Sequence, residues 1–534
     1  MRPLFKGGDQ TDPNCYRPIS ILPCPSKIIE KLVNNQLSWY LNSYNILSPA
    51  QSGFRPGFGC VTATLKVLND ITSALDSKLH CAAIFIDLAK AFDTVNHSIL
   101  SDRLNSIGVQ GRSLEWFSSF LSGRTQSVKS EHFLSQPLSV TKGVPQGSTL
   151  APTLFSIYIN DIASSVPDAS VHLYADDTVL YTVGPSPAIV AQSLQASYAK
   201  IQHAFSSLHL LLNTKKTKIM WFERKSSDST GPDSEAIPGT DAKQKGSKKK
   251  PAKGKAANGK GSKTAGPVPP PATPPPTALP PHTSSPIAAT PSTSSPTAAC
   301  PAASSHCNHL VITSLDGSAL EQVPEYKYLG FWLDSTLSFS SHLRKLQSKV
   351  KAKLGFLYRM RSTFTPSAKL TLVQMTILPM LDYGDTIYRS ANKGALGKLD
   401  VLYHSAIRFA TNAPPRTHHC SLYSSVNWPS LGTRRNIHWY TLIYKSLLGL
   451  SPPYLCNLLQ LSSAAYNTRS ANLILLKVPK TRYAIGETSF HVAAAKDWND
   501  LQKSLKLSTF ISKSAFKTSV TATLKDTCRC FPSK

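Results

Sequence analysis

The spacing of hydrophobic residues changes along the chain and predicts both helices and strands. SKIIEKLVNNQLSWYL (26–41) keeps a helical period, which predicts a helix with Ser26 as its cap. CAAIFIDL (81–88) is a short apolar run that ends in an acid and predicts a buried strand. VHLYADDTVLYTV (171–183) predicts two strands joined by a tight acidic turn. The apolar positions of the first helix are Ile28, Ile29, Leu32, Val33, Leu37 and Leu41.

Later stretches continue this mixture of elements. SLEWFSSFLSG (113–123) predicts a helix ended by its final glycine, and STLAPTLFSIYINDI (148–162) predicts a helix after a Gly/Pro turn. PEYKYLGFWLDSTLSF (324–339) predicts two short strands. SHLRKLQSKVKAKLGFLYRM (341–360) predicts a basic amphipathic helix, and the rest of the chain is expected to be mainly helical.

The pattern breaks down between residues 225 and 310. This stretch holds ten Lys against four Asp and Glu, and residues 243–263 alone carry nine Lys and no acid. Residues 267–301 then carry 13 Pro among Ala, Ser and Thr. Such a segment has too little apolar surface to offset the chain entropy lost on folding. We therefore expect a disordered insert, first basic and then stiffer and rich in proline.

Composition narrows the classes of partner. The 534 residues exceed one ordinary core and predict about two to four domains. The net charge is +28 and the pI about 9.7; the insert contributes +6, so +22 remains elsewhere. An excess of this size indicates an acidic partner, either nucleic acid or an anionic membrane. The longest apolar runs, such as 81–88 and 471–478, are too short for a bilayer span. No leader pattern follows Met1, so we expect no signal peptide, no membrane association and a nucleic-acid partner.

The cysteines indicate a reducing, intracellular setting. There are ten, none in a CxxC motif, in a chain too large to need disulfides. One local group, Cys300, His306, Cys307 and His309, raises the alternative of a zinc site. Its spacing is not that of a standard zinc finger, so chance clustering stays the other interpretation.

Three aspartates form the strongest candidate for chemistry. Asp87 ends a predicted strand, and Asp176 and Asp177 occupy the predicted hairpin turn. Nucleotidyl transfer requires charge neutralisation by divalent ions, and Mg²⁺ prefers carboxylate oxygens. Acids at converging strand ends satisfy this need. A pair of aspartates in a turn is also common as a simply solvated turn, so the pair by itself leaves both interpretations open.

The sequence motifs that accompany these aspartates, taken in their order along the chain, resemble those of reverse transcriptases, and most closely those of non-LTR (LINE-type) retrotransposons. The matching stretches of the palm are FIDLAKAFDTV (85–95) for motif A, KGVPQGSTLAPTLFSIYINDI (142–162) for motif B, LYADDTVLY (173–181) for motif C, LLLNTKKTKIMWF (210–222) for motif D and EYKYLGFWLDSTLSFSSHL (325–343) for the primer grip. Outside the palm they are FKGGDQTDPNCYRPISILPCPSKIIEKL (5–32) and QSGFRPG (51–57) in the fingers, and SPPYLCNLL (451–459), NTRSA (467–471) and VAAAKDWNDL (492–501) near the C-terminus.

The resemblance implies an α+β right-hand polymerase fold, with fingers, a palm built on an antiparallel sheet and a helical thumb, followed by a mainly helical C-terminal region. The implied divisions are fingers 1–80, palm 81–224, the insert 225–310, the primer-grip end of the palm 311–340, thumb 341–420 and a basic helical region 421–534. An insert between motif D and the primer grip need not disrupt the palm if both of its ends lie at the surface.

The resemblance also assigns roles to residues. It makes Asp87, Asp176 and Asp177 the catalytic ligands of two Mg²⁺ ions (Mn²⁺ being possible), with the Leu88 carbonyl in support, and Lys216 a proton donor to pyrophosphate. Phe92 would be the steric gate that excludes a 2′-hydroxyl, its alternative being a core aromatic. Asp93 is expected to be a capping acid that points away from the metals. Residues assigned to the incoming nucleotide are Lys6, Arg17, Phe92, Gln146 and Gly147. Residues assigned to template and primer are Arg55, Pro145, Ser148, Tyr328, Leu329, Gly330, Arg344 and Lys345.

The function implied is RNA-directed DNA polymerisation, with an RNA template, a DNA primer or target, and deoxynucleoside triphosphates as partners. Because the match begins inside the fingers, we expect no upstream endonuclease, and we find no ribonuclease H domain or CCHC knuckle in the sequence. The main alternative is an inert retrotransposon-derived fragment that binds RNA or DNA. A third is a nuclear interaction protein that uses Lys243–Lys263. The Lys tract and the resemblance predict a location in the nucleus and cytoplasm.

Overall fold

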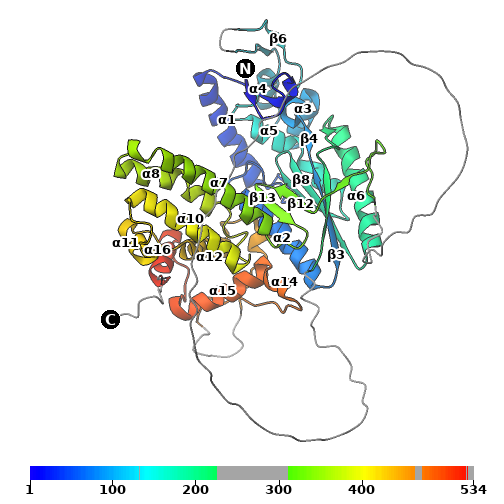
Figure 1. The fold of residues 1–534 in the computed structure, drawn as a ribbon. Coiled ribbons are helices and arrows are strands. Elements are labelled where there is room, and N and C mark those ends of the chain that lie inside the picture. Colours follow the sequence, from blue (N-terminus) through cyan, green and yellow to red (C-terminus); the bar gives the residue numbers. More distant parts are fainter. Residues whose placement is uncertain (131–132, 225–310, 463–471, 525, 527–534) are drawn as a thin grey trace, which may run out of the picture. The chain divides into compact units, whose positions relative to one another are not determined.

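A computed structural model describes residues 1–130, 133–224, 311–462, 472–524 and 526 (Figure 1). The chain divides into two units, and all described residues belong to the one made of Met1–Thr230 and His309–Lys534. The other unit, Gly231–Asn308, lies outside the described residues, as do the predicted insert and the Cys300–His309 group.

A five-stranded sheet forms the centre of the described unit. Its strands are β3 (His80–Ile86), β7 (Ser170–Tyr174), β8 (Asp177–Gly184), β10 (Lys218–Phe222) and β11 (Glu321–Gln322), in the order β11-β10-β3-β8-β7. The pairs β10–β3, β3–β8 and β7–β8 are antiparallel, as the sequence predicted. The edge pair β10–β11 is parallel, so β11 runs in the same direction as β10.

Both faces of the sheet are covered, and β3 shows this most clearly. Cys81, Ala83 and Phe85 point into one hydrophobic cluster, whereas the alternate residues Ala82 and Ile84 point into another. Alternate side chains of a strand lie on opposite faces, so two covered faces need a continuous apolar run. This explains why CAAIFI has no polar position.

The first cluster joins the sheet to α2 (Cys60–Asp76) and to helices from the C-terminal half of the chain. The second lies between the sheet and helices of the N-terminal half. These helices are α1 (Cys24–Ser43), α3 (His97–Ser106), α4 (Arg112–Leu121), α5 (Ala151–Tyr158) and α6 (Pro187–Ser207).

Besides the central sheet, the described residues form four two-stranded sheets and several short 3₁₀ helices. The paired strands are β1 (Arg2–Phe5) with β2 (Tyr16–Ile19), β4 (Leu88–Ala89) with β9 (Leu211–Leu212), β5 (Thr125–Gln126) with β6 (Leu138–Ser139), and β12 (Glu325–Tyr328) with β13 (Phe331–Asp334). The short 3₁₀ helices are η1 (Pro13–Cys15), η2 (Ala91–Asp93), η3 (Asn160–Ser165) and η5 (Arg361–Thr363).

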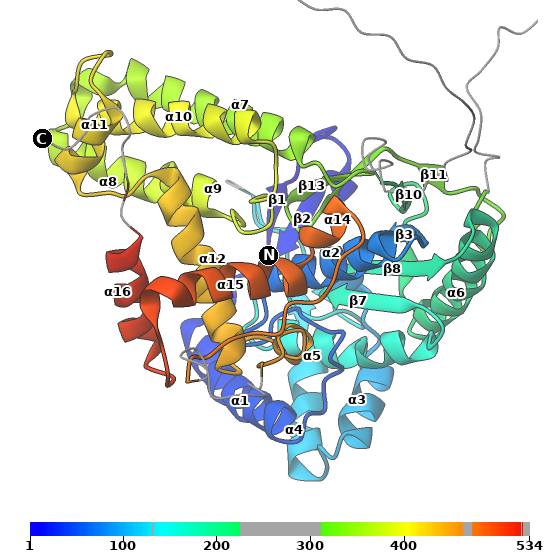
Figure 2. The same ribbon diagram turned by 90° about the horizontal axis from the view of Figure 1, so that it is seen from below.

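The described part of the chain after β13 is mainly helical, as predicted. Its helices are α7 (Ser340–Arg359), α8 (Pro366–Thr376), α9 (Leu378–Asp382), α10 (Lys393–Thr411), α11 (His419–Val426), α12 (Leu431–Leu447), α13 (Pro453–Cys456), α14 (Ala484–Glu487), α15 (Phe490–Leu505) and α16 (Lys513–Thr523). In both views α14 and α15 lie beside α2, so helices far apart in the sequence pack together (Figures 1 and 2). Within the described residues, no helix is long and apolar enough to cross a membrane.

Two helices differ from their predictions. α1 begins at Cys24 rather than Ser26, whose hydroxyl instead donates to Glu30 (3.0 Å). Its apolar residues also do not all face the core. Leu37 and Leu41 are buried, but Ile28, Ile29 and Leu32 are 63%, 51% and 60% exposed. The predicted helix 148–162 begins only at Ala151 and gives way to η3 after Tyr158, because its first residues form the turn described below.

Candidate active site

The three predicted aspartates meet at one end of the central sheet. Asp87 directly follows β3, Asp176 lies in the turn between β7 and β8, and Asp177 is the first residue of β8. In the antiparallel register Ile86 pairs with Thr178, so the next positions, Asp87 and Asp177, lie across from each other. The sequence pattern placed each acid at a strand end, and the register brings the acids to the same end.

These carboxylates lie close enough to repel one another. Burial raises the pKa of Asp177 to about 6, and the charges of Asp176 and Asp87 act in the same direction. Burial and the charge of Asp176 likewise raise the pKa of Asp87, against the opposing charge of Lys216. Uncompensated carboxylates of this kind favour a divalent cation, and their hard oxygens suit Mg²⁺ or Mn²⁺. The donor set therefore fits the predicted ions.

The loop between β9 and β10 holds Asp87 from its other side. Asn213 donates its backbone N–H to the Asp87 carbonyl (2.8 Å), and Thr217 Oγ1 accepts from the Asp87 N–H (3.3 Å). The Asn213 side chain also hydrogen-bonds the Asp87 carboxylate. Lys216 Nζ lies 3.9 Å from Asp87 Oδ2, with its side chain 71% exposed. The sequence comparison singled out only Lys216 for chemistry, and the structure adds Asn213 and Thr217 as supports.

The acidic turn rests on Ala50 and on the first three residues of the QSGFRPG stretch (51–57). The Ser52 N–H donates to the Leu173 carbonyl (2.8 Å), and the Leu173 N–H donates to the Ala50 carbonyl (2.9 Å). Ala175 has a φ of +56°, which is unfavourable for a residue with a Cβ, so the turn needs external support. Gly53 approaches it so closely that a Cβ on Gly53 would lie 2.4 Å from the Ala175 nitrogen. No sequence pattern indicated this contact.

The motif B turn is held against the loop after β4. The Gly143 N–H donates to the Val95 carbonyl (2.7 Å), and the Gln146 side chain donates to Asp93 Oδ1 (2.8 Å). Burial raises the pKa of Asp93, and its hydrogen bond to Gln146 opposes this rise. The exposed Gly147 has a φ of +114° and lies against the Ser20 carbonyl. Gln146 thus orients Asp93, a partner that the sequence did not predict.

A buried carboxylate joins this turn to α1. Glu30 is 1% exposed and accepts hydrogen bonds from Ser148 Oγ (2.6 Å), the Thr149 N–H (2.8 Å) and Ser26 Oγ. Ser148 Oγ in turn accepts from the Ala151 N–H (3.1 Å), and the Ser148 N–H donates to the Pro145 carbonyl (3.0 Å). Ser148 Oγ thus hydrogen-bonds backbone groups at the start of α5. Its predicted template contact stays a prediction.

Phe92 has features of both interpretations made of it. Its half-buried ring stacks on Phe155 (centroids 4.5 Å apart), as a core aromatic would. The exposed Phe54 ring contacts the Phe92 ring edge to face, with centroids 6.2 Å apart, so this aromatic pair extends to the surface.

The basic residues of the N-terminal segment are used in different ways. Lys6 lies close enough to the acidic site for its charge to lower the pKa of Asp87 and of Asp93. Arg17 is exposed on β2. Arg55 is partly buried, donates to the Ser48 carbonyl (2.8 Å) and the Gln51 carbonyl (3.0 Å), and lies over Phe58 at 4.2 Å. Arg55 thus braces its own loop, while Lys6 and Arg17 face outward.

The predicted primer grip is the turn between β12 and β13. Tyr328 is buried at 2% exposure, and Leu329 and Gly330 both have positive φ values, of +45° and +92°. The hydroxyl of Tyr383 donates to the Leu329 carbonyl (3.0 Å), and its ring stacks on Phe331 at 5.2 Å. Because Tyr383 itself is 45% exposed, it forms an outer wall of the turn that sequence comparison missed.

The basic helix α7 is divided between internal and external contacts. Lys345 pairs with Glu325 and lies 3.0 Å over the Trp332 ring, so its charge is used within the protein. Arg344 is exposed, and further exposed cations follow it on the helix. They are Lys349, Lys351, Lys353 and Arg359.

Other groups of possible metal ligands lie in the helical half. Among the described residues, those whose ligand atoms all fall within 4.8 Å of one another are His418–His419–Cys420 and Asp382–Asp385–His438. In the second group Arg434 pairs with Asp382 and His438 hydrogen-bonds Asp385 (2.7 Å), so its charges are already balanced. The three aspartates at the sheet end are more widely spread than either group.

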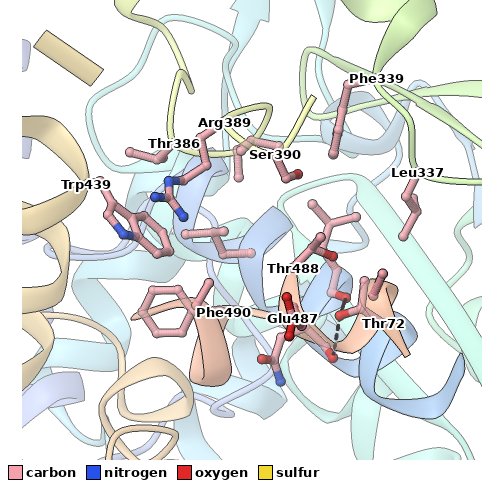
Figure 3. A pocket seen from close by; sticks show the side chains of 16 residues that line it. Thr72, Leu337, Phe339, Thr386, Arg389, Ser390, Trp439, Glu487, Thr488 and Phe490 are labelled. Atoms are coloured by element: carbon pink, nitrogen blue, oxygen red, sulfur yellow. Dashed lines mark hydrogen bonds between the residues drawn. The ribbon is translucent and has the colours of Figure 1, made fainter. Parts of the chain in front are cut away.

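A cavity of about 250 Å³ lies apart from the acidic residues (Figure 3). Figure 3 shows Trp439 and Phe490 on one side of it and Thr72 and Thr488 on the other. Arg389, which lies over Trp439 at 4.3 Å, pairs with Asp497 (2.6 Å). The cavity is lined by residues of α2 and of the C-terminal half of the chain, and none of the predicted catalytic residues line it.

One protein family matches the chain across both this acidic site and the primer grip. Residues 6–333 match the family described as reverse transcriptase (RNA-dependent DNA polymerase). The chain belongs to the reverse transcriptase family. Its fold is therefore the α+β polymerase fold predicted from the sequence, with the parallel edge pair as the one difference in the sheet.

Similar reverse transcriptases come from mobile elements, which confirms the predicted resemblance to non-LTR elements. The RNA-directed DNA polymerase from mobile element jockey of Drosophila melanogaster is 24% identical over 80% of this chain and 39% of its own length. The probable RNA-directed DNA polymerase from transposon BS of the same species is 26% identical over 79% and 39%. The chain thus spans about two fifths of these relatives. A solved telomerase from Candida albicans is 12% identical over 76% of this chain and 56% of its own, with a TM-score of 0.32.

Proposed function

We propose that this chain is an RNA-directed DNA polymerase of a non-LTR retrotransposon. In the reaction, a primer 3′-hydroxyl attacks the α-phosphorus of a deoxynucleoside triphosphate and pyrophosphate leaves. The observation that carries the proposal is the meeting of Asp87, Asp176 and Asp177 at one sheet end, where burial and their mutual repulsion raise the pKa of Asp87 and of Asp177. Family membership supports the same chemistry.

Asp87, Asp176 and Asp177 would hold two divalent ions, with Mg²⁺ favoured by the carboxylate donors. The chemistry that such ions supply is activation of the attacking hydroxyl and neutralisation of charge on the phosphate oxygens. The chain's own part is to hold the carboxylates in place. Asn213 and Thr217 fix Asp87, and the antiparallel register fixes Asp177 opposite to it.

The surrounding residues would handle the proton and the nucleotide. Lys216, 3.9 Å from Asp87 and well exposed, is placed to donate a proton to the departing pyrophosphate. Lys6 offers a cation beside the same acids. Phe92, held by Phe155, would lie under the sugar and exclude a 2′-hydroxyl by shape. The exposed cations of α7 suit the phosphates of a template–primer duplex.

Primer extension on an RNA template tests the proposal. Purified protein is given a DNA primer, dNTPs and Mg²⁺, and is compared with Asp176→Asn. The matched control is Asp102→Asn, an exposed carboxylate on α3 away from the sheet end. We expect extension by the unchanged protein and the control only. Product formation equal to that of Asp176→Asn, with RNA binding retained, would instead support the inert nucleic-acid binder.

We also propose that the partners are an RNA template, a DNA primer or target, and dNTPs, acting in the nucleus and cytoplasm. Support for the partners comes from the family and from the net charge of +28. Support for the location comes only from the Lys tract of residues 243–263.

A further inference from the structure

One side chain from the last fifth of the chain, that of Tyr454, contacts the residues that support the acidic turn. Tyr454 belongs to α13, in the SPPYLCNLL stretch that lies beyond the family match to residues 6–333. Its hydroxyl lies 2.9 Å from Ser52 Oγ and donates to Thr62 Oγ1 at 3.3 Å. Its ring meets His172 edge to face, with centroids 5.3 Å apart.

Ser52 passes this contact on to the strand that carries the acids. Its hydroxyl lies 2.9 Å from His172 Nε2, and its N–H donates to the Leu173 carbonyl (2.8 Å). His172 and Leu173 belong to β7, which ends two residues before Asp176. Ser52 is fully buried and His172 is 3% exposed, so water cannot replace a lost partner.

The turn beyond β7 depends on this arrangement. Ala175 has the left-handed backbone conformation and is packed against Gly53, the neighbour of Ser52. A shift of residues 52–53 would therefore move or release the turn that bears Asp176. The Phe58 ring also packs on the Tyr454 ring, with centroids 5.8 Å apart, so Tyr454 contacts residues 50–58 at two positions.

We propose that Tyr454 is a positioning residue for the acidic turn, acting through Ser52 and His172. The C-terminal region is in this sense part of the polymerase centre rather than an appendage to it. The proposal rests on the proposed function, because its main readout is the rate of polymerisation. It predicts that the Tyr454 hydroxyl supports turnover and contributes little to substrate binding.

The test is Tyr454→Phe in the full chain, which removes only the hydroxyl. The matched control is Tyr403→Phe, whose hydroxyl donates to the Pro429 carbonyl (2.9 Å) within the C-terminal helices. We expect Tyr454→Phe to lower kcat for primer extension about tenfold with KM for dNTP and primer–template unchanged. Tyr403→Phe should stay within twofold of the unchanged protein. Hydrogen exchange at residues 172–178 should become about tenfold faster in Tyr454→Phe alone.

Each other outcome is also decisive. Equal kcat and equal exchange in the two variants would overturn the proposal, as would a rise in KM with kcat unchanged. If Tyr454→Phe does not fold, Ser52→Ala removes the same contact from the other side and should give the same loss of kcat. If the unchanged protein shows no extension above Asp176→Asn, the proposed function fails, and the exchange at residues 172–178 then decides this inference by itself.

Discussion

Gly53 offers a sharp test of how closely the acidic turn is fitted to its support. In Gly53→Ala the added Cβ would lie 2.4 Å from the Ala175 nitrogen, 3.0 Å from its Cα and 3.2 Å from Gln51 Oε1. Ordinary contacts of a Cβ begin at about 3.4 Å, so the two backbones must separate by about 1 Å. The atoms in the way are backbone atoms, which cannot rotate aside. Asp176, the next residue, has to move with Ala175.

A displacement of this size has separate effects on stability and on rate. Overpacking of a well-filled site costs about 1–3 kcal/mol, which leaves most domains folded. A misplacement of about 1 Å in a catalytic group lowers the rate by about 10²-fold. We therefore expect Gly53→Ala to lower kcat for primer extension about 100-fold, and to lower the free energy of unfolding in urea by about 1–3 kcal/mol.

The matched control lies six residues further on. Gly59 has no positive φ, and a Cβ added there would have nothing within 4 Å, so Gly59→Ala changes the same atoms without a clash. It should keep kcat within twofold. Single-turnover extension measures the rate, and urea unfolding confirms that the variant is folded under assay conditions. A folded Gly53→Ala protein with kcat within threefold of the unchanged protein would refute the fitted-turn argument.

Three further predictions follow from the same description. Lys216→Met removes the cation 3.9 Å from Asp87 and should lower kcat by about 10²-fold in single-turnover extension, with RNA binding unchanged; a loss confined to binding would contradict the proton-donor role. Phe92→Val should raise the incorporation of ribonucleotides relative to deoxynucleotides in a competition assay, and an unchanged ratio would leave Phe92 as a core aromatic. Burial lowers the pKa of His342 to about 4, whereas in the unfolded chain the same imidazole takes up a proton near pH 6.5. The contribution of His342 to the free energy of unfolding is therefore complete above pH 6.5 and decreases as the pH falls toward 4. His342→Asn removes this titration, so the free energy of unfolding, measured in urea at pH 7 and pH 5, should fall by up to about 2 kcal/mol less than in the unchanged protein.

Local patterns in the sequence were sufficient for the elements that carry the acids. The run 81–88 and the alternation in 171–183 depend on neighbours in the same strand, so Asp87 and the Asp176–Asp177 turn could be placed without knowing the rest of the fold. Their meeting required the motif order of a family as well. The individual roles of the predicted residues remain predictions.

The sequence could not reveal how buried polar groups choose their partners. Helical periodicity assigned Ile28, Ile29 and Leu32 to a core, but the buried position between them is Glu30. A carboxylate can be buried there because Ser148, Thr149 and Ser26 supply three hydrogen bonds, and two of these donors are more than 115 residues away. The same limit hid Asn213, Tyr383 and Tyr454, whose partners come from distant parts of the chain.

The contact between Tyr454 and Ser52 also has a consequence for how the protein is made. The two residues are 402 positions apart, so the contact closes a very long loop, although each doubling of loop length adds only about 0.6 kcal/mol of closure entropy. The larger effect is on time, because long-range contacts form late and slowly. During synthesis the N-terminal residues emerge first, and the acidic turn stays without its outer support until α13 has left the ribosome. Nascent chains stalled before residue 454 therefore carry all three aspartates but lack the contact that steadies them, which delays maturation of the site until α13 has been made.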